Sequence, residues 1–92
     1  MNLQELIQTN EGTILDVRTD FEFESAHADH SINISLYELP ERMEEIKAMQ
    51  QPIILCCASG GRSAQARNYL SQQGITCHDA GSWTTVQLLK NN

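Results

Sequence analysis

One short segment combines a candidate nucleophile, a flexible turn and a fixed positive charge. It consists of Cys57, Ala58, Ser59, Gly60, Gly61, Arg62 and Ser63. Small residues and two glycines let such a backbone curl until successive N–H groups point inward, which forms an anion-binding nest. A helix that begins at this point adds the free N–H groups of its first turn and the positive end of its dipole. The segment therefore predicts a site for an anion.

Cys57 is the residue of this segment that predicts chemistry. Thiols at helix N-termini or beside cationic groups have pKa values of about 3.5–7.5, compared with about 8.5 for a free cysteine. Arg62 contributes a guanidinium group whose planar fork suits a phosphate, a sulfonate or a sulfate-like group. We therefore expect Cys57 to be a thiolate nucleophile and residues 58–63 to bind a small anionic donor.

Alternating strand and helix patterns predict where this segment lies in the fold. Residues 53–57 form an uninterrupted apolar run, typical of a strand covered on both faces, and residues 62–73 carry apolar side chains at helical spacing before Gly74. Strands are also predicted at 13–17, 31–35 and 75–78, and helices at 3–7, around 21–23, at 40–49 and after Ser82. This alternation favours an α/β domain with parallel strands, in which ligands bind beyond the carboxyl ends of the strands. Cys57 lies at such an end.

The composition argues against several classes of protein. The 92 residues suit one domain spanning 1–92, and 12 acidic against 6 basic side chains give a net charge of -6, which argues against binding to duplex nucleic acid. Residues 46–78 contain no Asp or Glu, so this acidic chain keeps the segment around Cys57 free of negative charge. No apolar run approaches the roughly 18–20 residues that span a bilayer, and the amino terminus lacks the basic region of a signal peptide. We expect a soluble, cytoplasmic monomer with no nucleic-acid or membrane partner.

The three cysteines do not follow a disulfide or metal-binding pattern. Cys56 and Cys57 are adjacent, Cys77 is the third, and no C-x-x-C occurs. An odd number of cysteines favours a reducing compartment, and no standard zinc spacing joins Cys77 and His78 to the other two. We therefore expect no metal and no cofactor. Because side chains alternate along a strand, Cys56 should face away from Cys57 into the core.

Several other residues have structural interpretations. Asp16 and Arg18 suit an ion pair that braces a loop, and His27 suits a hydrogen-bonded structural histidine. Trp83 is interpreted as a core anchor for the last helix. Arg67 lies more than a turn into its helix, so we expect it to be solvated and to add to the local positive field.

The sequence resembles the single-domain rhodanese-like sulfurtransferases at several separate places. Residues 57–63 are similar to the family's Cys-x-x-Gly-x-Arg-Ser loop, and residues 14–18 followed by 21–23 resemble its Asp-x-Arg strand end and acidic helix. Residues 27–34 are similar to its Gly-His-Ile-Pro-Gly-Ala-Ile-Asn-Ile segment, and residues 81–83 to its Gly-Gly-Trp turn. The resemblance implies a rhodanese-like three-layer α/β domain, with a small, mostly parallel sheet of about four strands and helices on both faces.

The resemblance also implies sulfane-sulfur transfer through a persulfide on Cys57. The thiolate would attack the outer sulfur of thiosulfate or of another persulfide-type donor, and a thiol, a protein or cyanide would then accept that sulfur. Ala58 stands where family members active on thiosulfate often carry a basic residue. We therefore expect weak affinity for thiosulfate.

Two other functions of the same thiolate stay open. The first is a sulfur-carrier or binding module with little thiosulfate activity. The second is a cysteine-dependent phosphatase or an arsenate reductase. Related phosphatases use Cys-x5-Arg, whereas only four residues separate Cys57 from Arg62, and the sequence has no obvious Asp general acid apart from Asp79. The shorter loop favours sulfur chemistry.

Overall fold

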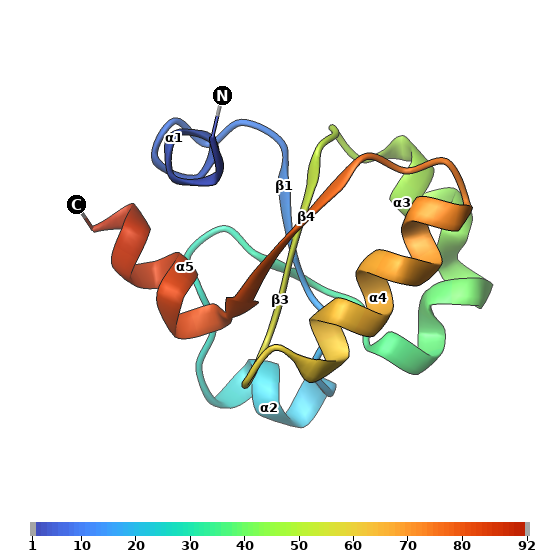
Figure 1. Ribbon diagram of the computed structural model, residues 1–92. Coiled ribbons are helices and arrows are strands. Elements are labelled where there is room, and N and C mark those ends of the chain that lie inside the picture. Colours follow the sequence, from blue (N-terminus) through green and yellow to red (C-terminus); the bar gives the residue numbers. More distant parts are fainter. Residues whose placement is uncertain (1, 92) are drawn as a thin grey trace.

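Four parallel strands form a single sheet in the computed structural model, which describes residues 2–91 (Figure 1). The strands lie in the order β2-β1-β3-β4, and each neighbouring pair is parallel. Their bounds are Thr13–Asp16 for β1, Ile32–Asn33 for β2, Ile53–Cys57 for β3 and Cys77–Ser82 for β4. The structure confirms the predicted α/β fold with a four-stranded parallel sheet.

Helices cover both faces of this sheet. One face carries α1 (Leu3–Gln8) and α5 (Trp83–Lys90), and the other carries the 3-10 helix η1 (Leu36–Arg42), α3 (Met43–Ala48) and α4 (Gly61–Gln72) (Figure 1). Each face buries its own hydrophobic cluster, and β3 supplies side chains to both. Cys57 belongs to one cluster and Cys56 to the other, which confirms that Cys56 faces away from Cys57. In the part of the chain that the structure describes, no helix has the length and apolar character needed to cross a bilayer.

The predicted helix at 40–49 divides into two elements. Pro40 lies inside η1, and α3 begins only at Met43. A proline has no N–H and cannot donate an i→i−4 hydrogen bond, so it suits a short 3-10 segment better than the interior of an α-helix. The Ser35 N–H donates to Glu38 Oε1 at 3.4 Å, which starts η1 earlier than the apolar pattern predicted.

The last strand lies further along the chain than the predicted residues 75–78. A bulge shifts its register against β3, so that Leu55 pairs with Asp79 on one side of the bulge and Cys57 pairs with Ser82 on the other. Polar and small side chains fill β4, so a search for alternating apolar residues does not find it. The bulge brings polar groups of β4 beside the end of β3.

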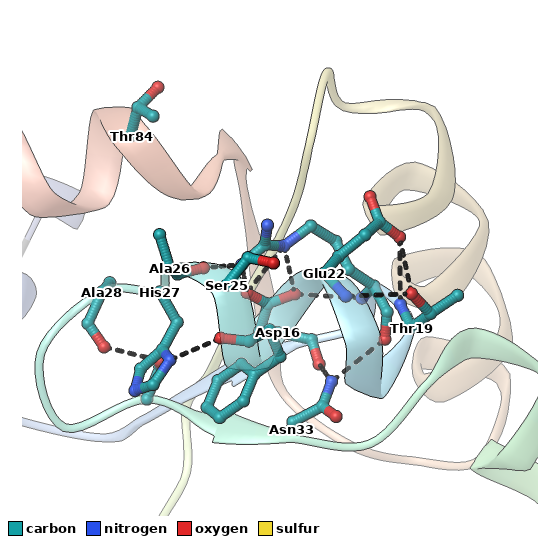
Figure 2. Close-up of polar contacts among 12 residues, drawn as sticks. Asp16, Thr19, Glu22, Ser25, Ala26, His27, Ala28, Asn33 and Thr84 are labelled. Carbon is teal, nitrogen blue, oxygen red and sulfur yellow. Dashed lines mark hydrogen bonds and ion pairs between the residues drawn. The ribbon is translucent and has the colours of Figure 1, made fainter.

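Side-chain hydrogen bonds accompany a shortened second strand. Only Ile32–Asn33 pair as β2, in place of the predicted 31–35. The Asn33 side-chain amide donates to the carbonyl oxygens of Asp16 and Arg18, each at 3.0 Å, and Figure 2 shows Asn33 in this position. The loop after β1 is thereby fixed to β2.

A buried ion pair braces the carboxyl end of β1. Arg18 Nη2 lies 2.8 Å from Asp16 Oδ2, and the two side chains are 5% and 0% exposed. The same nitrogen donates to the Ala26 carbonyl at 2.7 Å, and the Arg18 guanidinium lies 5.0 Å from the ring centre of Trp83. Figure 2 shows Asp16 and Ala26 within this network. The structure confirms the ion pair, which joins β1 to the segment after α2 (Asp20–Ser25) and to α5.

Two single-residue interpretations are also confirmed. His27 Nδ1 lies 2.7 Å from the Phe23 carbonyl oxygen, and the two rings stack with their centres 3.8 Å apart. Arg67 is exposed on α4.

The Arg18→Ala variant should lower the free energy of unfolding by about 3–5 kcal/mol, because it leaves the buried Asp16 carboxylate without its partner. Urea denaturation followed by circular dichroism measures this loss. Arg67→Ala removes an exposed arginine and is the matched control, with an expected change within about 0.5 kcal/mol. Equal stability of the two variants would contradict the role of the ion pair.

Candidate active site

Cys57 ends β3, and its sulfur faces the turn that precedes α4. Gly60 is the N-cap of α4 and has a φ of 106°, a left-handed conformation that a larger residue would adopt only under strain. The Gly60 N–H donates to Cys57 Sγ at 3.0 Å, and the Ser63 N–H donates to the same atom at 3.3 Å. Backbone amides on both sides of the turn therefore contact the sulfur.

These amides and the Ser63 side chain lower the pKa of a thiol that is only 1% exposed. Burial by itself raises the pKa of Cys57, but the contact of the sulfur with the Ser63 side chain and hydrogen bonds from the Ser63, Gly60 and Ser59 backbone outweigh burial and hold the pKa below the ordinary thiol value. Cys56 shows the opposite result, because burial and then the charge of Asp16 raise its pKa to about 12. Adjacent cysteines differ in acidity because Cys57 faces the loop amides and Cys56 does not.

The structure brings residues 57–63 together in one turn, but their contacts differ. Hydrogen bonds to the sulfur come from Ser59, Gly60 and Ser63. Gly61 is the first residue of α4, and a Cβ atom at this position would meet no neighbouring atom within 4 Å. Space is therefore open beside Gly61. The roles of Ala58, Gly61 and Arg62 in binding a donor, and of Cys57 as the nucleophile, stay predictions.

Arg62 is already bound to a carboxylate in this structure. Its two terminal nitrogens lie 2.6 Å and 2.9 Å from the two carboxylate oxygens of Glu22 on α2. Hydrogen bonds from Arg62, followed by one from the Thr19 backbone, lower the pKa of Glu22 to about 2, and Figure 2 shows the Thr19–Glu22 contact. The sequence analysis did not identify this pair. The Thr19 and Glu22 spacing of a capping box places Glu22 on α2, but no local pattern connects it to a residue 40 positions away.

Ser63 and Asp79 form a second contact that the sequence analysis did not predict. The buried Ser63 hydroxyl donates to Asp79 Oδ1 at 2.7 Å, and the same hydroxyl oxygen lies 3.5 Å from Cys57 Sγ. The Gly81 N–H also donates to Asp79 Oδ1, at 2.9 Å. This contact depends on the bulge that shifts β4 along β3, which explains why the sequence pattern does not show it.

A family comparison agrees with this geometry. Residues 2–91 match the model of the family described as "Rhodanese-like domain". The chain belongs to the rhodanese-like domain family. Its resemblance to the Cys-x-x-Gly-x-Arg-Ser loop therefore reflects family membership. The family that the sequence predicted is confirmed.

Relatives and solved structures support the same assignment. A protein of Allochromatium vinosum named "Sulfurtransferase" is 34% identical over 71 residues, which cover 77% of this chain and 65% of that protein. The matched regions span 65% and 49% of the first two curated relatives, so the chain covers less than two thirds of either protein. A rhodanese-related protein of Thermoplasma volcanium superimposes with a TM-score of 0.71 at 34% identity, covering 83% of this chain and 75% of that one. A structure described as "rhodanese with anions from E. coli" also has a TM-score of 0.71, at 28% identity, covering 79% and 88%.

Alkylation by iodoacetamide should follow the ionisation of Cys57, with a midpoint below the pKa of about 8.5 for a free cysteine. Tandem mass spectrometry distinguishes modification of Cys57 from that of Cys56, which should not react in the folded protein because its pKa is about 12. A midpoint for Cys57 at or above the ordinary thiol value would show that the amides do not stabilise the thiolate.

Proposed function

We propose that this chain is a sulfurtransferase that moves sulfane sulfur through a persulfide on Cys57. The observation that carries the proposal is the Cys57 sulfur at the end of β3, which accepts hydrogen bonds from the Gly60 and Ser63 N–H groups. Membership of the rhodanese-like family and the name of the Allochromatium relative support a transferase role.

The proposed reaction has two displacement steps. The Cys57 thiolate attacks the outer sulfur of the donor, the donor's S–S bond breaks, and the electron pair leaves with sulfite or with a thiolate. This forms a Cys57 persulfide anion, which the loop amides are oriented to stabilise. A thiolate or cyanide then attacks the outer sulfur, and the electron pair of the broken bond returns to Cys57.

The charges around the loop favour a donor with little charge. Glu22 occupies both terminal nitrogens of Arg62, and Ala58 carries no charge. The thiosulfate dianion would therefore meet a neutralised arginine and a carboxylate. We infer that a persulfide of a thiol or of a protein is a better donor than thiosulfate. The same contact supports a sulfur carrier with little thiosulfate turnover as the second candidate.

The contacts of Asp79 give less support to a phosphatase. Its Oδ1 already accepts hydrogen bonds from Ser63 and Gly81, so this oxygen is directed into the fold. A general acid must instead reach the leaving oxygen of the substrate.

The three cysteines are free, which suits the proposed cytoplasmic setting with a thiol or protein as sulfur acceptor.

Incubation with a persulfide of a small thiol should add one sulfur atom to the protein, and cyanide should remove it. Intact-mass spectrometry measures both steps. Cys57→Ser should lose the adduct completely, whereas Cys77→Ser should keep it, because Cys77 lies on β4 away from the loop amides. An adduct of equal size in Cys57→Ser would exclude Cys57 as the carrier, and hydrolysis of an aryl phosphate without an adduct would favour the phosphatase.

Glu22→Gln should raise the affinity for thiosulfate by about three- to tenfold, because it frees the Arg62 fork to bind the donor. The KM for thiosulfate in a cyanide-acceptor assay measures this effect. Glu24→Gln removes the same charge from an exposed position on the same helix and should leave the KM nearly unchanged. If both variants lower the KM equally, net charge and not the Glu22–Arg62 contact controls donor binding.

A further inference from the structure

The Ser63 hydroxyl has a single hydrogen and three acceptors around it. Its oxygen lies 2.7 Å from Asp79 Oδ1, 3.1 Å from the Gly60 carbonyl oxygen and 3.5 Å from Cys57 Sγ. The carboxylate is the closest of the three, and a charged acceptor forms the strongest hydrogen bond with a neutral donor. The distances therefore place the hydrogen on the side of Asp79, and the hydroxyl presents its lone pairs to the sulfur.

The fold holds Asp79 in this position from two directions. The bulge pairs Asp79 with Leu55 and brings Gly81 opposite Cys56, and the Gly81 N–H donates to the same carboxylate oxygen at 2.9 Å. Gly81 has a φ of 77°, a left-handed conformation that suits the glycine at this bulge. The carboxylate is thus fixed beside the Ser63 hydroxyl.

We propose that Asp79 is a positioning residue that acts on Cys57 through Ser63. It does so by accepting the single hydrogen bond that the Ser63 hydroxyl can donate. A hydroxyl held in this way can accept a hydrogen bond from the thiol but donates only weakly to the thiolate, so Asp79 limits how far the Ser63 side chain stabilises the ionised sulfur. Asp79 therefore opposes the ionisation that the Gly60 and Ser63 amides favour. The backbone amides lower the pKa of Cys57, and the Ser63–Asp79 pair limits how far the pKa falls.

This balance has a consequence for both half-reactions, and it rests on the proposed sulfur transfer. The nucleophilicity of a thiolate rises with the pKa of its thiol, whereas its ability to leave falls. Cys57 is the attacking group when sulfur is taken up and the leaving group when sulfur is passed on. Asp79 therefore favours uptake and slows discharge.

Other charged groups face this cluster and define the controls. Arg62 precedes Ser63 on α4 and is paired with Glu22, while Arg67 and His78 line an open pocket of about 370 Å³ together with Asp79. A change of charge at Asp79 also acts on Cys57 through space. The effect that passes through Ser63 must therefore be separated from the direct electrostatic effect.

The test is a double-mutant cycle on the pKa of Cys57, measured from the pH dependence of iodoacetamide alkylation. Asp79→Asn keeps an oxygen for the Gly81 N–H but is a weaker acceptor for Ser63, so the hydroxyl can turn to the sulfur. We expect the pKa of Cys57 to fall by roughly one unit. In the Ser63→Ala background the same substitution should shift it by less than about half as much.

Ser63→Ala alone tests the proposal even where the Asp79 variants fail to fold. This variant keeps the Ser63 N–H and removes only a hydroxyl whose hydrogen bond to the sulfur is weakened by Asp79, so the pKa of Cys57 should change by less than about half a unit. A rise of about one unit would overturn the proposal, because it would show that the hydroxyl donates fully to the sulfur in the presence of Asp79. An equal effect of Asp79→Asn with and without the hydroxyl would overturn it too.

The two half-reactions give a second readout. With a small-thiol persulfide as donor and cyanide as acceptor, Asp79→Asn should slow uptake per thiolate and speed discharge, each by about threefold. A merely structural role would slow both steps, and this result would contradict the proposal. If Cys57 takes up no sulfur from any donor, the proposed function fails, but the alkylation cycle still decides the role of Asp79.

Discussion

The hydrogen bonds from the Gly60 and Ser63 N–H groups to the Cys57 sulfur are the interaction on which the rest of the site depends. Without them burial would favour the neutral thiol, since burial is also the largest cause of the high pKa of Cys56 one residue earlier. The apolar strand β3 brings the sulfur to the edge of the sheet, and the left-handed conformation of Gly60 begins α4 close enough for its first amides to reach it. The core of the domain thus positions the Cys57 sulfur, and the loop lowers the pKa of its thiol.

Two carboxylates near the loop, Glu22 and Asp79, bind loop side chains and so modify the environment of the Cys57 sulfur. Glu22 neutralises Arg62, so the site stabilises an anion on Cys57 itself without a free guanidinium to attract a charged donor. Asp79 accepts a hydrogen bond from the Ser63 hydroxyl and, in the proposal made above, limits how far that side chain can stabilise the thiolate. Both carboxylates act on a partner that belongs to the loop. The result is a thiol whose pKa is lowered by backbone amides and by a restrained Ser63 side chain, which suits the proposed transfer, in which the sulfur must both attack and leave.

Local patterns in the sequence were sufficient to predict the loop at residues 57–63 and insufficient to predict the residues that contact it. The apolar run of β3, the glycine turn and the start of α4 are consecutive, so composition and spacing predict them. Glu22 reaches Arg62 across 40 residues, and Asp79 reaches Ser63 only because a bulge moves β4 along β3. Pairings of this kind depend on tertiary register and not on local propensity. The predicted helix at 40–49 failed for a local reason, since Pro40 favours the 3-10 segment that precedes α3.

The most direct test of the central claim is a pH titration of the backbone amides by ¹H–¹⁵N NMR. Hydrogen bonds to a thiolate are stronger than those to a thiol, so the Gly60 and Ser63 amide protons should move downfield together as Cys57 ionises. Their common midpoint should lie below the ordinary thiol pKa of about 8.5, and the transition should vanish in Cys57→Ala. Amide resonances that do not titrate with Cys57, or that titrate only above that value, would contradict the account.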